Sequence, residues 1–182
     1  GNPHIAEWAR PLMDDRDIAV ETFFNAESVD PDAQTVASME GSELAYDLLV
    51  TIPPHAGVDL VEAAGLGEGW VSVDKHTLEA EAAANVYAIG DAAQTGVPKA
   101  GSVAHYQAGV VARRLASHLR GRPATATYDG KTLCFIETGM DAASYVEFDY
   151  ESPPAPALPS QMLHWAKLAY NESYWLTARG LL

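Results

Sequence analysis

Apolar residues recur at the three- and four-residue spacing of an amphipathic helix in three parts of the chain. The first part begins near the N-terminus and ends at Asp14-Asp15, and the second runs from Lys99-Ala100-Gly101 to about Leu119. The third part, residues 161–182, is rich in aromatic side chains. Gly121-Arg122-Pro123 follows the second part and is a strong helix stop. The pattern therefore predicts three helices.

Short runs of β-branched, aromatic and other apolar residues between these helices predict strands. The runs are residues 18–24, 27–30, 35–39, 44–52, 70–73, 86–89, 132–138 and 143–150. Pro31-Asp32 predicts a turn between the second and third runs, and the four prolines of residues 151–159 predict an extended linker. Helices mixed with strands indicate the α/β class. Short antiparallel strands that lead into an apolar strand are typical of the back half of a nucleotide-binding domain.

Composition and charge narrow the possible functions. A hydrophobic share of 48% of the 182 residues is enough to build a core, and no apolar run approaches the roughly 18 residues that span a bilayer. The formal net charge is −14, and the excess lies in residues 1–100, which hold 18 acidic and four basic residues. Residues 101–182 hold seven of each. Because the chain has no basic stripe, we do not expect it to bind nucleic acid.

Cysteine, histidine and glycine positions exclude several kinds of site. The single cysteine, Cys134, cannot form an internal disulfide, and the six histidines do not lie at metal-ligand spacing. We therefore expect no metal. Residues 65–69 read Gly-Leu-Gly-Glu-Gly, but their spacing differs from that of a phosphate-binding loop, and no apolar strand leads directly into them. The glycine-rich residues 57–69 are better interpreted as a connector rich in turns.

Residues 85–93 are the most informative stretch. They form an apolar run that ends in Gly90 and Asp91. Glycine lets a ligand approach the backbone, and a carboxylate accepts hydrogen bonds from the hydroxyls of a sugar-like chain. An aspartate after a strand also suits a helix cap. The residues by themselves leave both interpretations open.

This stretch resembles the second flavin-binding motif of flavoprotein reductases that have two dinucleotide-binding domains. Thr77-Leu78, several residues before the apolar run, fits the same motif. The resemblance implies that Gly90 and Asp91 contact FAD, with the Asp91 carboxylate holding its ribityl chain.

Other segments are similar to the sulfide:quinone oxidoreductases, from about residue 20 to the C-terminus. They are Ile52-Pro53-Pro54-His55, residues 69–74, Tyr128-Asp129-Gly130 with Cys134, residues 147–150, and Tyr174-Trp175 with Arg179-Gly180. The resemblance implies two Rossmann-like domains, bound FAD, a redox cysteine pair, sulfide and quinone as substrates, and a quinone site beside a membrane-touching C-terminal region. Type II NADH dehydrogenases and the flavin subunit of flavocytochrome sulfide dehydrogenase are similar in outline. A cysteine at position 134 favours the sulfide branch.

The family opens with a strand–GxGxxG–helix unit that cradles the FAD pyrophosphate, and this chain contains no such unit. The first redox cysteine of the family also precedes the part that this chain resembles. We therefore expect a C-terminal portion that lacks its N-terminal FAD-binding part and is inactive alone. Residues 1–56 would be the back half of the second, NAD-like domain, residues 57–124 the C-terminal part of the FAD-binding domain, and residues 125–182 a segment with the redox cysteine and the membrane- or quinone-facing helix.

Cys134 and Lys99 acquire roles only through this resemblance. A lone cysteine on an apolar strand is usually a buried, inert side chain, whereas the family pattern implies that Cys134 is one of the redox pair. A lysine at a helix start opposes the helix dipole unless an anion lies there. We expect Lys99 and the N–H groups of Ala100 and Gly101 to stabilise the reduced flavin, although a solvated Lys99 is the simpler alternative.

The aromatic C-terminal helix suits either the headgroup region of a membrane or a cover for the protein core, and the two are compatible. Candidate quinone or membrane contacts are Trp165, Tyr170, Tyr174 and Trp175. The predicted location is cytoplasmic and peripheral at the membrane. Two other hypotheses remain: a type II NADH dehydrogenase-like protein in which Cys134 is structural, and a catalytically silent fragment whose aromatic end docks a partner.

Overall fold

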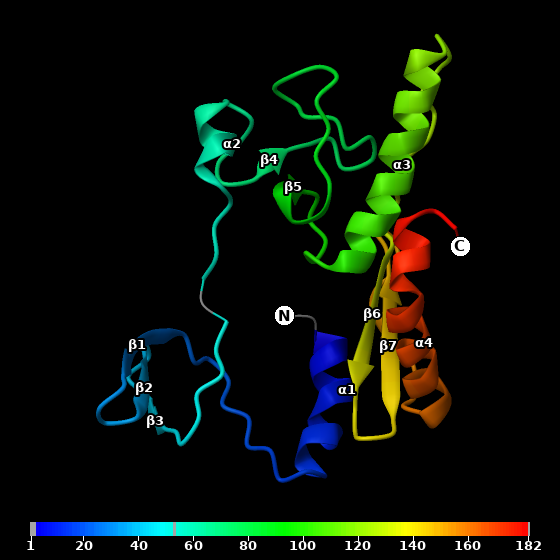
Figure 1. Cartoon of the computed structure of the whole chain (residues 1–182). Helices are drawn as coiled ribbons and strands as arrows, with labels where there is room; N and C mark the ends of the chain where they lie inside the picture. The colour runs from blue at the N-terminus through cyan, green and yellow to red at the C-terminus, as the bar shows by residue number, and fades with distance from the viewer. Residues whose placement is uncertain (1–2, 53, 182) are drawn as a thin grey trace. The chain divides into compact units, whose positions relative to one another are not determined.

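A computed structural model describes residues 3–52 and 54–181 of the chain (Figure 1). Gly1-Asn2, Pro53 of the family-like segment, and Leu182 at the end of the third predicted helix lie outside the described residues. The helices are α1 (Pro3–Asp14), α2 (Asp59–Ala63), α3 (Gly101–Leu119) and α4 (Gln161–Ala178), with one 3₁₀ turn, η1 (Gly90–Ala92). The three predicted helices are confirmed as α1, α3 and α4. The short α2 was not predicted and lies within the glycine-rich connector.

The strands form three small sheets, so the α/β class is confirmed. One antiparallel sheet contains β1 (Ala26–Asp30), β2 (Thr35–Ser38) and β3 (Glu43–Ala45). A parallel pair contains β4 (Val71–Ser72) and β5 (Ala93–Gln94), and the third sheet contains β6 (Thr132–Glu137), β7 (Ala143–Phe148) and β8 (Ala155–Pro156). The chain divides into two compact units, Ala9–His55 and a second unit that holds the described residues on either side of it.

In the unit Ala9–His55, a local turn brings β1 and β2 together. The Asp30 carboxylate accepts hydrogen bonds from the N–H groups of Asp32 and Ala33, both at 2.9 Å. Asp30 then pairs with Thr35 as the first rung of the antiparallel ladder. An aspartate that bonds the backbone two and three residues ahead is a common way to start a turn. The predicted strand pair and its turn at Pro31-Asp32 are confirmed.

Two predicted strands of this unit were wrong. Residues 18–24 form no strand, and of residues 44–52 only the first two belong to β3. Leu48, Val50 and Ile52 are 82%, 85% and 87% exposed. An apolar run becomes a strand only where another strand satisfies its backbone groups and a layer covers its side chains. Among the described residues, no strand pairs with this run beyond Ala45.

The strand predicted at residues 86–89 was also wrong, because the segment is extended but forms no continuous strand. Only Tyr87 makes a β-bridge, to Glu79, although the segment remains extended. The Ala80 N–H donates to the Val86 carbonyl at 2.7 Å, and the Ala88 N–H donates to the Leu78 carbonyl at 3.1 Å. These bonds fix the segment against residues 78–80 and so set where the following Gly90-Asp91 turn begins.

One core cluster of the second unit lies along one face of α3. Val103 and Val110 are buried against Leu78 and Tyr128, and Tyr150 packs onto the same cluster. The rings of Tyr128 and Tyr150 meet edge-on with centroids 5.8 Å apart. The Tyr150 hydroxyl lies 3.1 Å from the Lys75 carbonyl and 3.2 Å from the Thr95 carbonyl, so it joins two loops that are far apart in sequence.

We expect the stability of this unit to fall as the pH rises from about 10 to about 12. Burial raises the pKa of both Tyr128 and Tyr150 from 10.0 to about 12, so the folded state keeps protons that the unfolded state loses in this range. The contribution of the two protonated tyrosines to the free energy of unfolding is complete below pH 10 and is lost as the pH approaches 12. Urea unfolding over this range should show a shallower decline for Tyr150→Phe. An unchanged decline would show that Tyr150 is not responsible.

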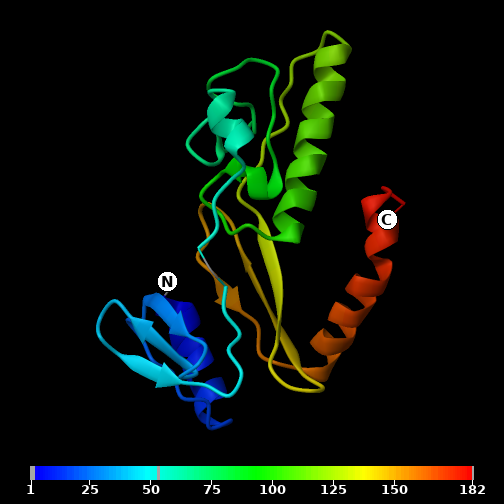
Figure 2. The ribbon, with the colours of Figure 1, turned by 60° about the vertical axis from the view of Figure 1, so that its left-hand side comes forward.

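The β6–β7 hairpin extends from the region of the first turn of α3, and α4 packs against β7 (Figure 2). Both strands were predicted. The proline-rich linker is not wholly free, because Ala155 of β8 pairs with Glu147 of β7. At the start of α4 the Ser160 hydroxyl accepts the Leu163 N–H at 3.2 Å, which is an ordinary N-cap.

Candidate functional site

The Gly90-Asp91 turn lies where the loop after residues 86–89 meets α3. Gly90 is buried with φ +62°, and a Cβ atom there would lie 3.0 Å from the Cβ atom of Ala104 on α3. Only glycine combines this backbone conformation with such a close approach. The following residue, Asp91, is exposed. The turn therefore leaves the Asp91 side chain exposed on a closely constrained backbone.

Lys99 binds the backbone of the same turn. Its Nζ atom donates to the carbonyl oxygens of Asp91 at 2.5 Å and Ala93 at 3.3 Å, and lies 4.8 Å from the centre of the Trp70 ring. Burial lowers the pKa of Lys99, and the charge of Asp91 partly opposes that shift. The predicted cation at the helix start is thus anchored to backbone carbonyls, and its charge lies beside Asp91.

The N-terminus of α3 is open. No side chain of the described residues caps it, and its first turn contains no acidic residue. The Ala100 N–H donates to the Pro98 carbonyl at 3.0 Å, so the N–H groups without a partner in the described chain begin at Gly101. A Cβ atom on Gly101 would meet nothing within 4 Å. This helix end could therefore accept an anionic group, although of the two predicted N–H donors only Gly101 is available.

Cys134 borders this helix end because α3 is tied to β6. The Ser102 hydroxyl donates to the Leu133 carbonyl at 2.6 Å, immediately before Cys134. A cavity of about 350 Å³ lies beside this bond. Its lining residues are Ala100, Gly101, Ser102, Leu133, Cys134, Phe135, Lys167, Tyr170, Asn171 and Tyr174. Five residues predicted from the sequence thus share one mostly apolar cavity.

The thiol of Cys134 is partly buried, and burial raises its pKa. A thiol with a raised pKa is protonated at neutral pH and is a weak nucleophile. Two features of the cavity favour a negative sulfur instead: the positive end of the α3 dipole and the N–H of Gly101, which has no partner among the described residues. The α3 dipole therefore opposes the effect of burial on the Cys134 thiol.

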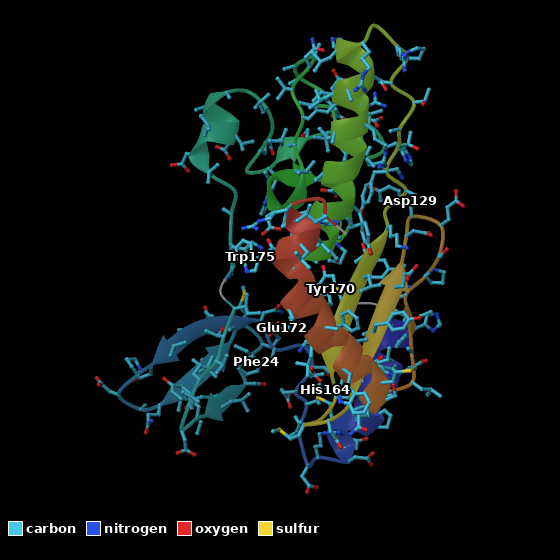
Figure 3. The ribbon with its side chains drawn as sticks, turned by 45° about the vertical axis from the view of Figure 1, so that its right-hand side comes forward. Phe24, Asp129, His164, Tyr170, Glu172 and Trp175 are labelled. Carbon is cyan, nitrogen blue, oxygen red and sulfur yellow. The ribbon has the colours of Figure 1, made fainter. Side chains whose placement is uncertain are left out.

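The four predicted aromatic residues of α4 separate into two pairs. Tyr170 and Tyr174 line the cavity, and the Tyr170 ring lies 5.9 Å from that of Phe135 on β6. Trp165 and Trp175 are 60% and 68% exposed and do not line it. Figure 3 shows His164, Tyr170 and Trp175 in succession along α4. One helix therefore supplies both a cavity wall and an exposed aromatic surface.

Glu137 at the end of β6 fixes the position of α4. Its carboxylate lies 2.8 Å from Lys167 Nζ and 3.1 Å from His164 Nδ1. Hydrogen bonds from these two side chains hold the pKa of Glu137 below its usual range. Lys167 also lines the cavity, so the ion pair and the cavity wall share a side chain.

We expect acid to weaken the attachment of α4 through Glu137. A carboxyl whose pKa is depressed in the folded state contributes stability above its unfolded pKa, and that stability is lost as the pH falls through the lower folded value. Glu137→Gln should remove this acid-dependent loss, measured by urea unfolding at a series of pH values. Glu172→Gln, on the same helix (Figure 3), is the matched control and should leave the acid-dependent loss unchanged. Equal acid sensitivity of Glu137→Gln and the unsubstituted protein would contradict this role.

Comparisons with known proteins identify what the chain is similar to. No family model matches it. It is 28% identical over 167 residues to the mitochondrial sulfide:quinone oxidoreductase of Mus musculus, covering 87% of this chain and 37% of that protein. It is 32% identical over 163 residues to the enzyme of the same name from Schizosaccharomyces pombe, covering 77% and 36%. The chain is similar to a C-terminal portion of the sulfide:quinone oxidoreductases.

Solved structures agree with this assignment of fold. The sulfide:quinone oxidoreductase of Aquifex aeolicus matches with a TM-score of 0.77 at 19% identity, over 96% of this chain and 45% of that chain. A chain in the Tetrahymena thermophila mitochondrial ATP synthase structure matches with a TM-score of 0.68 at 27% identity, over 79% and 36%. The predicted fold, the C-terminal part of such a flavoprotein, is confirmed. This oxidoreductase-like chain spans about a third of the length of its curated relatives.

Several residues that line this cavity or hold the Gly90-Asp91 turn were not predicted from the sequence. Ser102, Phe135, Lys167 and Asn171 line the cavity but belong to no motif. Gln107 is fully buried on the apolar face of α3. Its position between Val103 and Val110 at helical spacing was a usable signal, because a buried amide requires hydrogen-bond partners.

In residues 3–52 and 54–181, no group of three or more His, Cys, Asp and Glu side chains is arranged to hold a metal ion. Of the helices that the structure describes, none is both long enough and apolar enough to cross a bilayer.

Proposed function

We propose that this chain forms the C-terminal portion of an FAD-dependent sulfide:quinone oxidoreductase. The whole protein would pass two electrons from sulfide, through a cysteine pair and FAD, to a membrane quinone. The observation that carries the proposal is the cavity where Cys134, the open N-terminus of α3 and Tyr170 meet. The names of the curated relatives support the choice of sulfide and quinone as substrates.

The residues that would hold FAD are Gly90, Asp91 and the first turn of α3. The exposed Asp91 carboxylate suits the ribityl hydroxyls, and the Gly101 N–H with its open side suits an anionic edge of the flavin. FAD bound there would supply the two-electron acceptor that amino-acid side chains lack. The FAD pyrophosphate and the rest of the cofactor would be held by residues outside this chain.

Cys134 would form a disulfide with a cysteine outside this chain. Hydrosulfide attacks one sulfur, the S–S bond breaks, one cysteine becomes a persulfide, and the other leaves as a thiolate with the bonding electron pair. The positive end of α3 would stabilise negative charge on Cys134 as it develops. The side chains of Leu133 and Phe135 would give the reactive sulfur an apolar border.

The two aromatic pairs of α4 would serve the quinone and the membrane. Tyr170 and Tyr174 give the cavity flat aromatic walls that suit a quinone ring. The exposed Trp165 and Trp175 suit the interface between headgroups and acyl chains. A peripheral position on a membrane would let a quinone reach the cavity from the lipid.

Lys99 would make the flavin easier to reduce. Its ammonium adds positive charge beside Asp91, and positive charge favours the reduced, anionic flavin. We expect Lys99→Met to lower the flavin reduction potential by about 30 mV, which corresponds to roughly 1.4 kcal/mol for two electrons. Lys75→Met is the control, because Lys75 lies over the Tyr150 ring instead. An unchanged potential in Lys99→Met would remove this role.

The function is tested by an anaerobic titration of the flavoprotein that carries this chain, following the visible flavin band. Sulfide should bleach the band and a soluble quinone should restore it. Bleaching by NADH but not by sulfide would assign the protein to the type II NADH dehydrogenase-like branch. Absence of bleaching by either donor, with dithionite still effective, would leave the chain as a silent docking portion.

A further inference from the structure

We propose that Gln107 is a positioning residue that holds the Gly90-Asp91 turn in the shape that binds FAD. The inference rests on the proposed function, because the shape of this turn matters to catalysis only if Asp91 contacts the cofactor. Gln107 itself lies in the core of α3 and touches neither the cavity nor an exposed surface.

The amide of Gln107 spans both ends of the loop that contains Asp91. Its Oε1 atom accepts the Gly90 N–H at 2.6 Å, and its Nε2 atom donates to the Thr95 hydroxyl at 3.4 Å. Both Gly90 and Thr95 are buried, so water does not compete for these groups. The 2.6 Å bond is short for an N–H donor, whereas the bond to Thr95 is long. The stronger constraint therefore acts on Gly90, the residue directly before Asp91.

A buried amide at this position needs a reason, because the neighbouring face of α3 is apolar. Val103 and Val110 bury carbon on the same face, and a leucine or methionine would satisfy the packing equally well. The Gly90 N–H would then be buried without an acceptor, which is a costly arrangement. Gln107 resolves this problem and fixes the left-handed conformation of Gly90 at the same time.

Lys99 and Gln107 act on different parts of the same loop. Lys99 holds the carbonyl oxygens of Asp91 and Ala93, while Gln107 holds the N–H of Gly90 and the side chain of Thr95. These contacts constrain the backbone of the loop on both sides of Asp91. A binding loop that is already shaped loses less conformational entropy when its ligand arrives. We therefore expect FAD to meet an Asp91 whose backbone is already constrained.

The test compares Gln107→Met with two matched variants in the flavoprotein that carries this chain. Gln107→Met keeps the side-chain volume but removes the acceptor for Gly90, and should raise the FAD dissociation constant about tenfold, or about 1.4 kcal/mol. Thr95→Val removes only the long bond and should change the constant less than twofold. Val110→Ala lowers the stability of the same helix and should also leave FAD affinity unchanged.

Hydrogen exchange of the flavin-free protein provides the second measurement. The Gly90 amide should exchange slowly in the unsubstituted protein and in Thr95→Val, and quickly in Gln107→Met. Loss of stability in Gln107→Met without a change in FAD affinity or in Gly90 exchange would overturn the proposal and leave Gln107 as a core amide. If Gln107→Met does not fold, rapid exchange of Gly90 in the unsubstituted protein overturns it and slow exchange supports it.

These measurements separate the inference from the proposed function. A protein that binds no FAD and is not bleached by sulfide refutes the proposed function. Gly90 exchange still reports whether Gln107 holds the turn in that protein. A protein that binds FAD equally well with and without Gln107 refutes only the positioning role.

Discussion

Cys134→Ser should abolish the reduction of flavin by sulfide, by a factor on the order of 10⁴ or more, because serine cannot form a disulfide or a persulfide. The hydroxyl is smaller than the thiol and the site is only partly buried, so the fold should be retained. The rate is measured anaerobically from the visible flavin band after mixing with sulfide. Dithionite should still reduce the flavin, which would show that FAD remains bound.

Ile136→Val is the matched control for this experiment. Ile136 lies two residues further along β6, so the substitution trims the same strand without removing a sulfur. Its expected cost is about 0.5–1.5 kcal/mol of stability with no loss of sulfide oxidation. Turnover of Cys134→Ser within twofold of the unsubstituted protein would show that the thiol is structural. The NADH dehydrogenase-like hypothesis would then gain the support that the sulfide branch loses.

Gly90→Ala should lower the free energy of unfolding by about 2–5 kcal/mol and weaken FAD binding with it. Alanine at φ +62° costs roughly 1–2 kcal/mol. The added Cβ atom, 3.0 Å from that of Ala104, forces the loop and α3 apart at a further cost of about 1–3 kcal/mol. Urea unfolding measures the first effect, and fluorescence of released FAD measures the second.

Two further variants separate the causes. Gly96→Ala changes a glycine with φ +77° whose added Cβ atom would meet nothing within 4 Å, so it should show the backbone cost alone. Ala104→Gly removes the opposing methyl group and should restore part of the stability when combined with Gly90→Ala. If Gly90→Ala and Gly96→Ala lower the free energy of unfolding equally, the close approach of Gly90 to α3 does not contribute to stability.

The parts of the fold that could be predicted from sequence are those specified by local signals. Spacing of apolar residues located α3 and α4, and Pro31-Asp32 located the turn between β1 and β2. The failures at residues 18–24 and 44–52 share a cause. A strand depends on backbone partners supplied by other segments, and composition cannot reveal whether those partners are present.

The candidate site also combines residues that the sequence suggested with residues that only tertiary packing brings together. The resemblance to a known family suggested Asp91, Lys99 and Cys134, whose functional roles remain proposals. The cavity itself joins α3, β6 and α4, which meet only through tertiary packing, so Phe135 and Lys167 had no signature in the sequence. Gln107 was detectable in principle as an amide among apolar neighbours. Its partner, the N–H of Gly90, could be identified only in three dimensions.

The hydrogen bond from Ser102 to the Leu133 carbonyl limits how far Cys134 could move during the proposed disulfide chemistry. Cys134 is paired with Val146 across the hairpin, and the residue before it is fastened to the first turn of α3. The backbone that carries this thiol therefore cannot swing toward a distant partner without breaking the sheet or the helix start. During each catalytic cycle, the travel needed to make and break sulfur–sulfur bonds would fall to the other cysteine and the segment that bears it.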